Sequence, residues 1–130
     1  MDAEIRVEKG LLYTKDHEWV RVDGDVAEIG ICDYAQNHLG DIVYVDLPDE
    51  EDEFDAEEEI ASVESVKAAS EVMAPVAGTV VEVNEDLDDD PALLNKAPYE
   101  NWICKIKIAD KAELDNLMSD AEYEDFIKEA

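Results

Sequence analysis

The sequence predicts a mainly β fold, a barrel-sandwich of two antiparallel sheets with few helices. Short segments rich in valine, isoleucine and aromatic residues are separated by aspartate, glycine and proline turn signals. One strand pattern occurs twice, as GDIVYVD at 40–46 and GTVVEVN at 78–84, and an acidic stretch and another apolar strand segment follow each copy. Two similar strand sets indicate two sheets related by approximate two-fold symmetry, although two valine-rich strands can also resemble each other by chance.

The first half of the chain is expected to contain three strands and one short helix. Residues 11–31 are typical of two strands separated by a DGD turn signal. A helix is predicted near 33–40, with Asp33 as its N-cap and a glycine at its end. A strand follows at 41–48 and stops at a proline, and the acidic run 49–59 is expected to be a solvated loop or strand edge.

The second half begins with two apolar segments that flank Lys67. The strand GTVVEVNED follows, and 85–101 is expected to be a long excursion with about one helical turn because it contains two prolines and few apolar residues. Residues 102–108 (WICKIKI) alternate with the period of a strand. Apolar residues at helical spacing predict a C-terminal helix or helix pair near 110–128 that packs on the sheet.

A single domain over 1–130 is the simplest organisation for a chain of this length. We expect 1–10 to be flexible or strand-like and 110–130 to be a C-terminal helical segment. Cys32 and Cys104 lie in apolar or alternating runs, so both are expected to be buried small side chains. With no signal or transit segment and no membrane-length apolar run in the sequence, a cytoplasmic protein is expected.

The formal net charge of −27 is extreme, with 10 lysines and arginines against 37 acidic residues. It argues against nucleic acid as a partner, since no basic face is available to neutralise phosphates, and against an anionic membrane surface. Two interpretations remain open: the charge steers association with basic partner surfaces, or it is a solvation device of the kind found in proteins from salt-rich cells.

Catalytic patterns are absent from the sequence. Neither histidine has a serine or cysteine nucleophile at a recognisable spacing, and there is no glycine-rich phosphate loop, calcium loop or HExxH motif. We therefore expect no catalytic residues, no metal ligands and no enzyme activity of the chain on its own.

Lys67 is the residue that stands out. In ESVKAASEV it lies at the middle of an expected tight hairpin, with Val63 and Val66 before it and Val72 and Met73 after it as expected core residues. Its immediate neighbours are small, so a modifying enzyme can reach it. The alternative is an ordinary surface lysine.

Motifs along nearly the whole chain favour a modified Lys67 over an ordinary surface lysine. YTKDHEWV, GICDYAQNHLGDIVYVDLP, ESVKAAS, APVAGTVVEVNEDL and KAPYENWICKIKI, in this order over roughly 11–127, closely resemble the H-proteins of the glycine cleavage system. The resemblance implies a lipoyl/biotinyl-type sandwich in which Lys67 carries lipoate in amide linkage. The chain differs at Cys32, where threonine is usual, in 49–59, which lacks the usual glycines, and at 101–102, where many members have a glycine before the tryptophan.

The resemblance also implies the partners and the chemistry. Glycine decarboxylase (P-protein) would load an aminomethyl group onto the arm, an aminomethyltransferase (T-protein) would unload it, and dihydrolipoamide dehydrogenase (L-protein) would reoxidise the dithiol. A separate enzyme would attach the lipoyl group. A monomeric carrier is expected, which keeps the cargo at high effective concentration near successive active sites.

Two further sites follow from the resemblance. Glu18 and His38 match positions of a cleft into which the loaded arm folds back, and surface or capping roles are the alternative for both. The hairpin around the attachment site consists of Glu64, Ser65, Val66 and Ala68, and we expect Glu64 and Ser65 to help the attaching enzyme recognise it.

Other functions remain open from the sequence. They are an H-like lipoate relay, the lipoyl carrier of another dehydrogenase complex, a biotinyl carrier, and an acidic binding module without a prosthetic group. A biotinyl domain is disfavoured because methionines typically flank its lysine, whereas Val66 and Ala68 flank Lys67.

Overall fold

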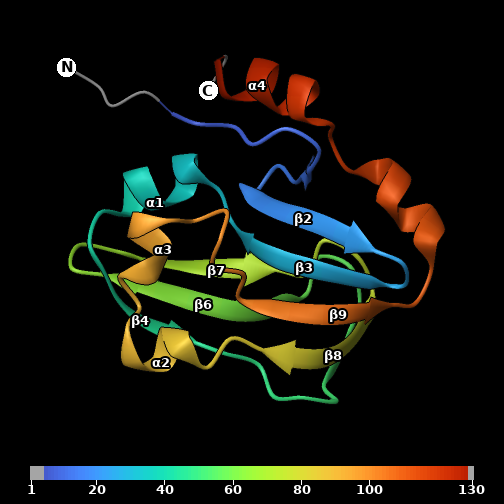
Figure 1. Cartoon of the computed structure of the whole chain (residues 1–130), viewed down its shortest axis with the longest axis horizontal. Coiled ribbons are helices and arrows are strands. Elements are labelled where there is room, and N and C mark those ends of the chain that lie inside the picture. The colour runs from blue at the N-terminus through green and yellow to red at the C-terminus, as the bar shows by residue number, and fades with distance from the viewer. Residues whose placement is uncertain (1–4, 129–130) are drawn as a thin grey trace.

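The computed structural model describes residues 5–128, and the strands in this range form two antiparallel sheets (Figure 1). The larger sheet has six strands in the order β1-β2-β3-β9-β8-β5, and the smaller has three in the order β4-β6-β7. The strands are β1 Leu12–Tyr13, β2 Glu18–Asp23, β3 Val26–Ile31, β4 Ile42–Asp46, β5 Glu53–Phe54, β6 Glu59–Ser65, β7 Ala69–Met73, β8 Gly78–Val83 and β9 Cys104–Ile108. The predicted mainly β sandwich is confirmed.

The repeated strand pattern corresponds to two strand pairs in different sheets. The copy at 40–46 contains β4, which pairs with β6 in the smaller sheet. The copy at 78–84 contains β8, which pairs with β9 in the larger sheet. In both copies the repeated strand therefore pairs with the apolar strand that follows it along the chain. A sandwich of two related halves requires this pairing.

The main core lies between the two sheets because each strand turns alternate apolar side chains inward. Val63 of β6 and Ile29 of β3 are fully buried, and full burial of such a side chain contributes roughly 1.5–3 kcal/mol. A second, mostly aromatic cluster lies beside this core; its members are Leu11, Tyr13, Trp19, Cys32, Tyr99 and Tyr123. Cys32 and Cys104 are buried as expected, and burial raises the pKa of both thiols, that of Cys104 to about 12.

The short helix after β3 is found close to its predicted position, as α1 (Asp33–Leu39). It ends at Gly40, whose φ of 79° lies in the left-handed region that favours glycine. The predicted N-cap is wrong by one residue: Cys32 holds that position and Asp33 is the first helical residue. The Asp33 carboxylate instead accepts hydrogen bonds from the Arg6 backbone N–H and the Gln36 side chain.

The C-terminal helical segment consists of two helices, a 3₁₀ helix (Lys111–Asn116) and α4 (Asp120–Lys128). Figure 1 shows α4 beside the N-terminal segment, at the β1–β2 side of the larger sheet. Its Tyr123 is fully buried and stacks on Tyr13 with ring centroids 4.4 Å apart, which fixes the helix to β1. No helix in residues 5–128 has the length and apolarity that crossing a membrane would need.

Two predicted regions have more elements than expected. The segment 11–31 forms three strands, because a turn at residues 15–17 separates β1 from β2. The excursion 85–101 contains two short helices, α2 (Asp86–Asp89) and α3 (Leu93–Lys96), where about one helical turn was predicted. The fully buried Leu87 and Leu94 anchor these helices to the core.

Candidate functional site

Lys67 lies in the connection between β6 and β7, the loop at the left edge of Figure 1. The last paired residues are Glu64 and Ala69, so the four residues 65–68 form the turn. The Ser65 hydroxyl accepts hydrogen bonds from the backbone N–H groups of Lys67 (3.3 Å) and Ala68 (3.1 Å). The Ser65 N–H donates to the Ala68 carbonyl at 2.7 Å, which closes the turn. The serine therefore holds the lysine at the tip.

The side chain of Lys67 is exposed, and its Cε lies close to Gly40, at the junction between α1 and β4. A Cβ added to Gly40 would lie 3.6 Å from Lys67 Cε, an ordinary van der Waals distance. Next to it, the Val66 N–H donates to the Asp41 carbonyl at 3.0 Å. Within residues 5–128 Lys67 takes part in no ion pair. Its amino group is therefore not held by a carboxylate of the described residues.

The prediction that Val66 belongs to the core is wrong. Val63 and Val72 are buried, but 71% of Val66 is exposed. Strand β6 ends at Ser65, so the alternation of side chains that buries Val63 no longer applies to Val66. Its exposure adds an apolar side chain to the surface beside the lysine.

Glu18, the first residue of β2, is the one buried charged side chain of the described part of the chain, with 1% exposure. Its carboxylate accepts hydrogen bonds from the Met73 N–H (2.8 Å) and the Thr14 hydroxyl (2.7 Å). Burial raises the pKa of Glu18 to about 7; the two hydrogen bonds oppose this rise and the charge of Asp16 adds slightly to it. Because Met73 ends β7, the carboxylate joins the two sheets.

A pocket of about 290 Å³ opens at Glu18. Its walls come from the β1–β2 turn (Thr14, Asp16), the end of β7 (Met73) and the segment after the 3₁₀ helix (Met118). No ion pair to Glu18 is found within residues 5–128. The cavity therefore adjoins a buried carboxylate that pairs with no cation of the described residues.

His38 lies elsewhere. It is exposed on α1, its Nδ1 lies 3.1 Å from the Tyr34 carbonyl oxygen, and it does not line the pocket at Glu18. Its ring and that of His17 both lie 4.2 Å from the Tyr34 ring, so the tyrosine is sandwiched between them. The nitrogen Nδ1 of His17 also lies 2.8 Å from the Tyr123 hydroxyl oxygen. Burial lowers the pKa of His17 and the nearby His38 lowers it further.

The structure thus separates the predicted residues into two places at opposite ends of β7. Lys67 and its hairpin neighbours lie before the strand, and Glu18 lies at its far end, beside Met73. Sequence reasoning missed Thr14, which lies four residues before Glu18 and both accepts from its N–H and donates to its carboxylate. A threonine at the start of a tight turn was the available signal.

Comparisons with known proteins agree with this geometry. The family model described as glycine cleavage H-protein matches residues 11–130. The glycine cleavage system H protein of Halothermothrix orenii is 52% identical over 126 residues, 96% of this chain and 98% of that protein. That of Clostridioides difficile is 56% identical over 115 residues, which cover 88% and 92% of the two chains.

The similarity to this family is also found in three dimensions. The crystal structure of a glycine cleavage system H protein from Mycobacterium marinum superimposes with a TM-score of 0.84 at 32% sequence identity. The match covers 94% of this chain and 99% of that one. The likeness therefore extends over both sheets and the C-terminal segment. The chain belongs to the glycine cleavage H-protein family.

Proposed function

We propose that this protein is the lipoyl-bearing carrier of a glycine cleavage system and that Lys67 carries the lipoyl group in amide linkage. The observation that supports the site most directly is the position of Lys67, exposed at the tip of a turn that Ser65 closes. The exposed Ala68 and Ala69 next to it leave room for an acyl chain. When bound, the lipoyl group supplies a disulfide that accepts the aminomethyl group of glycine on reduction.

The protein contributes position and shelter, and catalysis belongs to its partners. The partners are glycine decarboxylase, an aminomethyltransferase and dihydrolipoamide dehydrogenase. An arm tethered at Lys67 stays at high effective concentration at each partner's active site, so each transfer is effectively unimolecular.

We propose that the pocket at Glu18 receives the amine of the loaded arm. From Ala69 to Met73, β7 spans roughly 13 Å at about 3.3 Å per residue. About fifteen bonds separate the Cβ of Lys67 from the amine of a loaded lipoyl arm, and they span roughly 18 Å when extended, so the end of the arm can reach the region of the pocket. There the carboxylate of Glu18 would pair with the protonated amine, and the walls would exclude the water that hydrolyses it.

His38 would contact the arm close to Lys67, where the arm is attached. It lies two residues before Gly40, close to which the Cε of Lys67 lies, and it does not line the pocket at Glu18. We assign it contact with the stem of the arm, and Glu18 contact with the amine.

Peptide-mapped mass spectrometry tests the attachment site. The wild-type chain, Lys67→Arg and Lys107→Arg are each treated with a lipoate ligase, lipoate and ATP, then incubated with glycine and glycine decarboxylase. We expect the lipoyl and aminomethyl masses on Lys67 in the wild type and in Lys107→Arg, whose altered lysine is also exposed. Lipoylation without glycine-dependent loading would instead favour a lipoate relay or another dehydrogenase complex. An unmodified Lys67 would refute the assignment.

The amine site has its own test. In the loaded protein, Glu18→Gln should shorten the half-life of the aminomethyl group because the pairing charge is lost, whereas Glu59→Gln, on an exposed residue of β6, should not. Equal half-lives in both variants would remove Glu18 from the proposal and leave the lysine site untouched.

A further inference from the structure

Exposed apolar side chains gather beside the β6–β7 hairpin. Among residues 5–128 the large hydrophobic side chains that are exposed are Val22, Val43, Tyr44, Val66 and Val81. Two of them, Val22 of β2 and Val81 of β8, belong to the larger sheet. The other three are 54%, 51% and 71% exposed and belong to β4 and the hairpin. Single exposed apolar side chains are common on protein surfaces, whereas apolar side chains that gather in one place mark an interaction site more often.

The backbone brings these three residues together. Strand β4 pairs with β6 so that Ile42 faces Ser65 and Tyr44 faces Glu64, with an irregularity between the two pairs that leaves Val43 unpaired. A bulge of this kind lets two successive side chains face solvent, where a regular strand would bury one. Val66 follows Ser65 directly and is hydrogen-bonded to the residue before Ile42. We call Val43, Tyr44 and Val66 the hairpin patch.

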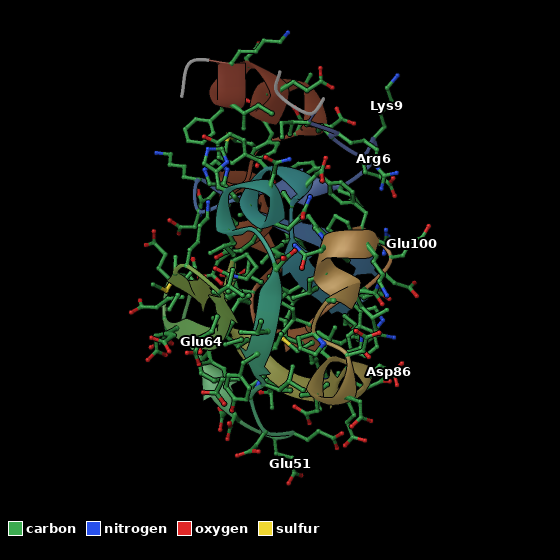
Figure 2. All side chains as sticks on the ribbon, turned by 90° about the vertical axis from the view of Figure 1, so that its left-hand side faces the viewer. Arg6, Lys9, Glu51, Glu64, Asp86 and Glu100 are labelled. Carbon is green, nitrogen blue, oxygen red and sulfur yellow. The ribbon has the colours of Figure 1, made fainter. Side chains whose placement is uncertain are left out.

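The surroundings of the hairpin patch are acidic. Asp41, Asp46 and Glu64 are exposed on the same strands or next to them. Figure 2 shows Glu64 at the surface far from the labelled cations Arg6 and Lys9, which lie at the α4 end of the molecule. Between residues 22 and 95 the sequence contains a single lysine or arginine, the hairpin lysine itself. A matching surface would be apolar at its centre and basic at its rim.

We propose that the hairpin patch is the docking surface for the enzyme that attaches the lipoyl group, a proposal that rests on the proposed function of Lys67. The attachment forms an amide bond: the neutral amine Nζ attacks the carbonyl carbon of an activated lipoyl donor, an adenylate or thioester. The bond from the carbonyl to the adenylate or thiolate breaks, and one proton leaves the nitrogen. No electrons are exchanged.

Among the enzymes that act on a lipoyl carrier, the attaching enzyme is the one whose reaction requires contact with the hairpin. Enzymes that use the finished arm reach it at the end of a chain of roughly 18 Å, so they can work without touching the hairpin. The attaching enzyme meets a bare lysine whose Cε lies close to Gly40, so its active site must approach the hairpin itself. Its surface then lies against the residues next to the lysine, and these are the hairpin patch.

The size of the patch fits a short-lived complex. Three side chains form the centre of an interface well below the ~1,200 Å² typical of stable complexes, so the bound state should be transient, as turnover of a protein substrate requires. Loss of the patch should therefore raise KM more than it lowers kcat.

The test measures the initial rate of Lys67 lipoylation by intact mass, with free lipoate, ATP and a lipoate ligase. The patch variant is Val43→Ser/Tyr44→Ser, and the matched control is Val22→Ser/Val81→Ser, in which exposed valines far from the hairpin change. All four side chains are at least 40% exposed, so both variants should keep the thermal midpoint of the wild type. The patch variant should lose about tenfold in kcat/KM and the control less than twofold.

The outcomes separate the two proposals. Near-wild-type lipoylation of Tyr44→Phe, together with the tenfold loss in the patch variant, supports docking through the apolar ring. Equal rates for patch variant and control overturn the docking surface. So does a patch variant that is lipoylated normally but no longer loaded by glycine decarboxylase, since the patch would then serve that enzyme. A wild-type chain left unmodified at Lys67 overturns the proposed function and this inference together.

Discussion

Replacement of Glu18 by glutamine should change how the stability of the protein depends on pH. The carboxylate is 1% exposed and accepts hydrogen bonds from Met73 and Thr14. Glutamine has nearly the same shape: its carbonyl can accept from the Met73 N–H while its amide donates to the Thr14 hydroxyl oxygen. The variant should therefore fold, and what it loses is the titration of the carboxyl group.

The magnitude follows from the pKa of Glu18, which is about 7 in the folded protein against an ordinary 4.5. Between these values the folded state binds a proton that the unfolded state has released, so the free energy of unfolding falls as pH rises. The stabilisation is complete below about pH 4.5 and is lost as pH passes 7. At 1.36 kcal/mol per pH unit, the total change is ~3 kcal/mol.

Urea unfolding of both proteins at pH 4.5, 5.5, 6.5 and 7.5, at constant ionic strength, measures this change. The many other carboxylates and His17 titrate in both proteins, so they cancel in the difference between the two curves. The free energy of unfolding of wild type minus that of Glu18→Gln should fall by ~3 kcal/mol from the lowest to the highest pH. Parallel curves would show that the carboxylate is solvated and would refute the reasoning about the pocket.

Three further outcomes are expected. Lys67→Arg should unfold at the same urea concentration as the wild type, since the side chain is exposed, yet show no lipoyl mass; a shifted midpoint would indicate a structural role. Gly30→Ala should cost ~2–3 kcal/mol in urea unfolding, because its Cβ would lie 2.6 Å from the buried Trp19 ring; a loss under ~0.5 kcal/mol would contradict that packing. If the net charge of −27 is a salt adaptation, the thermal midpoint should rise substantially in molar potassium chloride, and a flat response would favour steering of basic partners.

The sequence was sufficient to predict the features that depend on local pattern. Valine-rich alternation located both sheets, and Gly40 marked the end of α1 because its positive φ needs glycine. The exposure of Val66 was missed because burial depends on where β6 ends, and composition does not fix that residue. The N-cap was misplaced by one residue because the Asp33 side chain is used by Arg6 and Gln36.

The candidate site was predictable only in part, because some of its contacts join residues that are far apart in the sequence. Lys67 was identifiable because its neighbours in sequence are also its neighbours in space. The environment of Glu18 depends on Met73, which is 55 positions away, and on a pocket wall from the C-terminal segment. Neither contact leaves a local pattern, so the raised pKa of this carboxyl group was not predictable.

Acylation of Lys67 should also change the electrostatics of the smaller sheet. The amide is neutral, and the segment 22–95 then contains no lysine or arginine at all, while Asp46, Glu64 and Glu71 of that sheet stay charged and exposed. A basic partner should therefore bind the modified protein more tightly than the bare one, by up to about 1 kcal/mol for one exposed charge. Because salt screens such contacts, the preference should shrink as ionic strength rises.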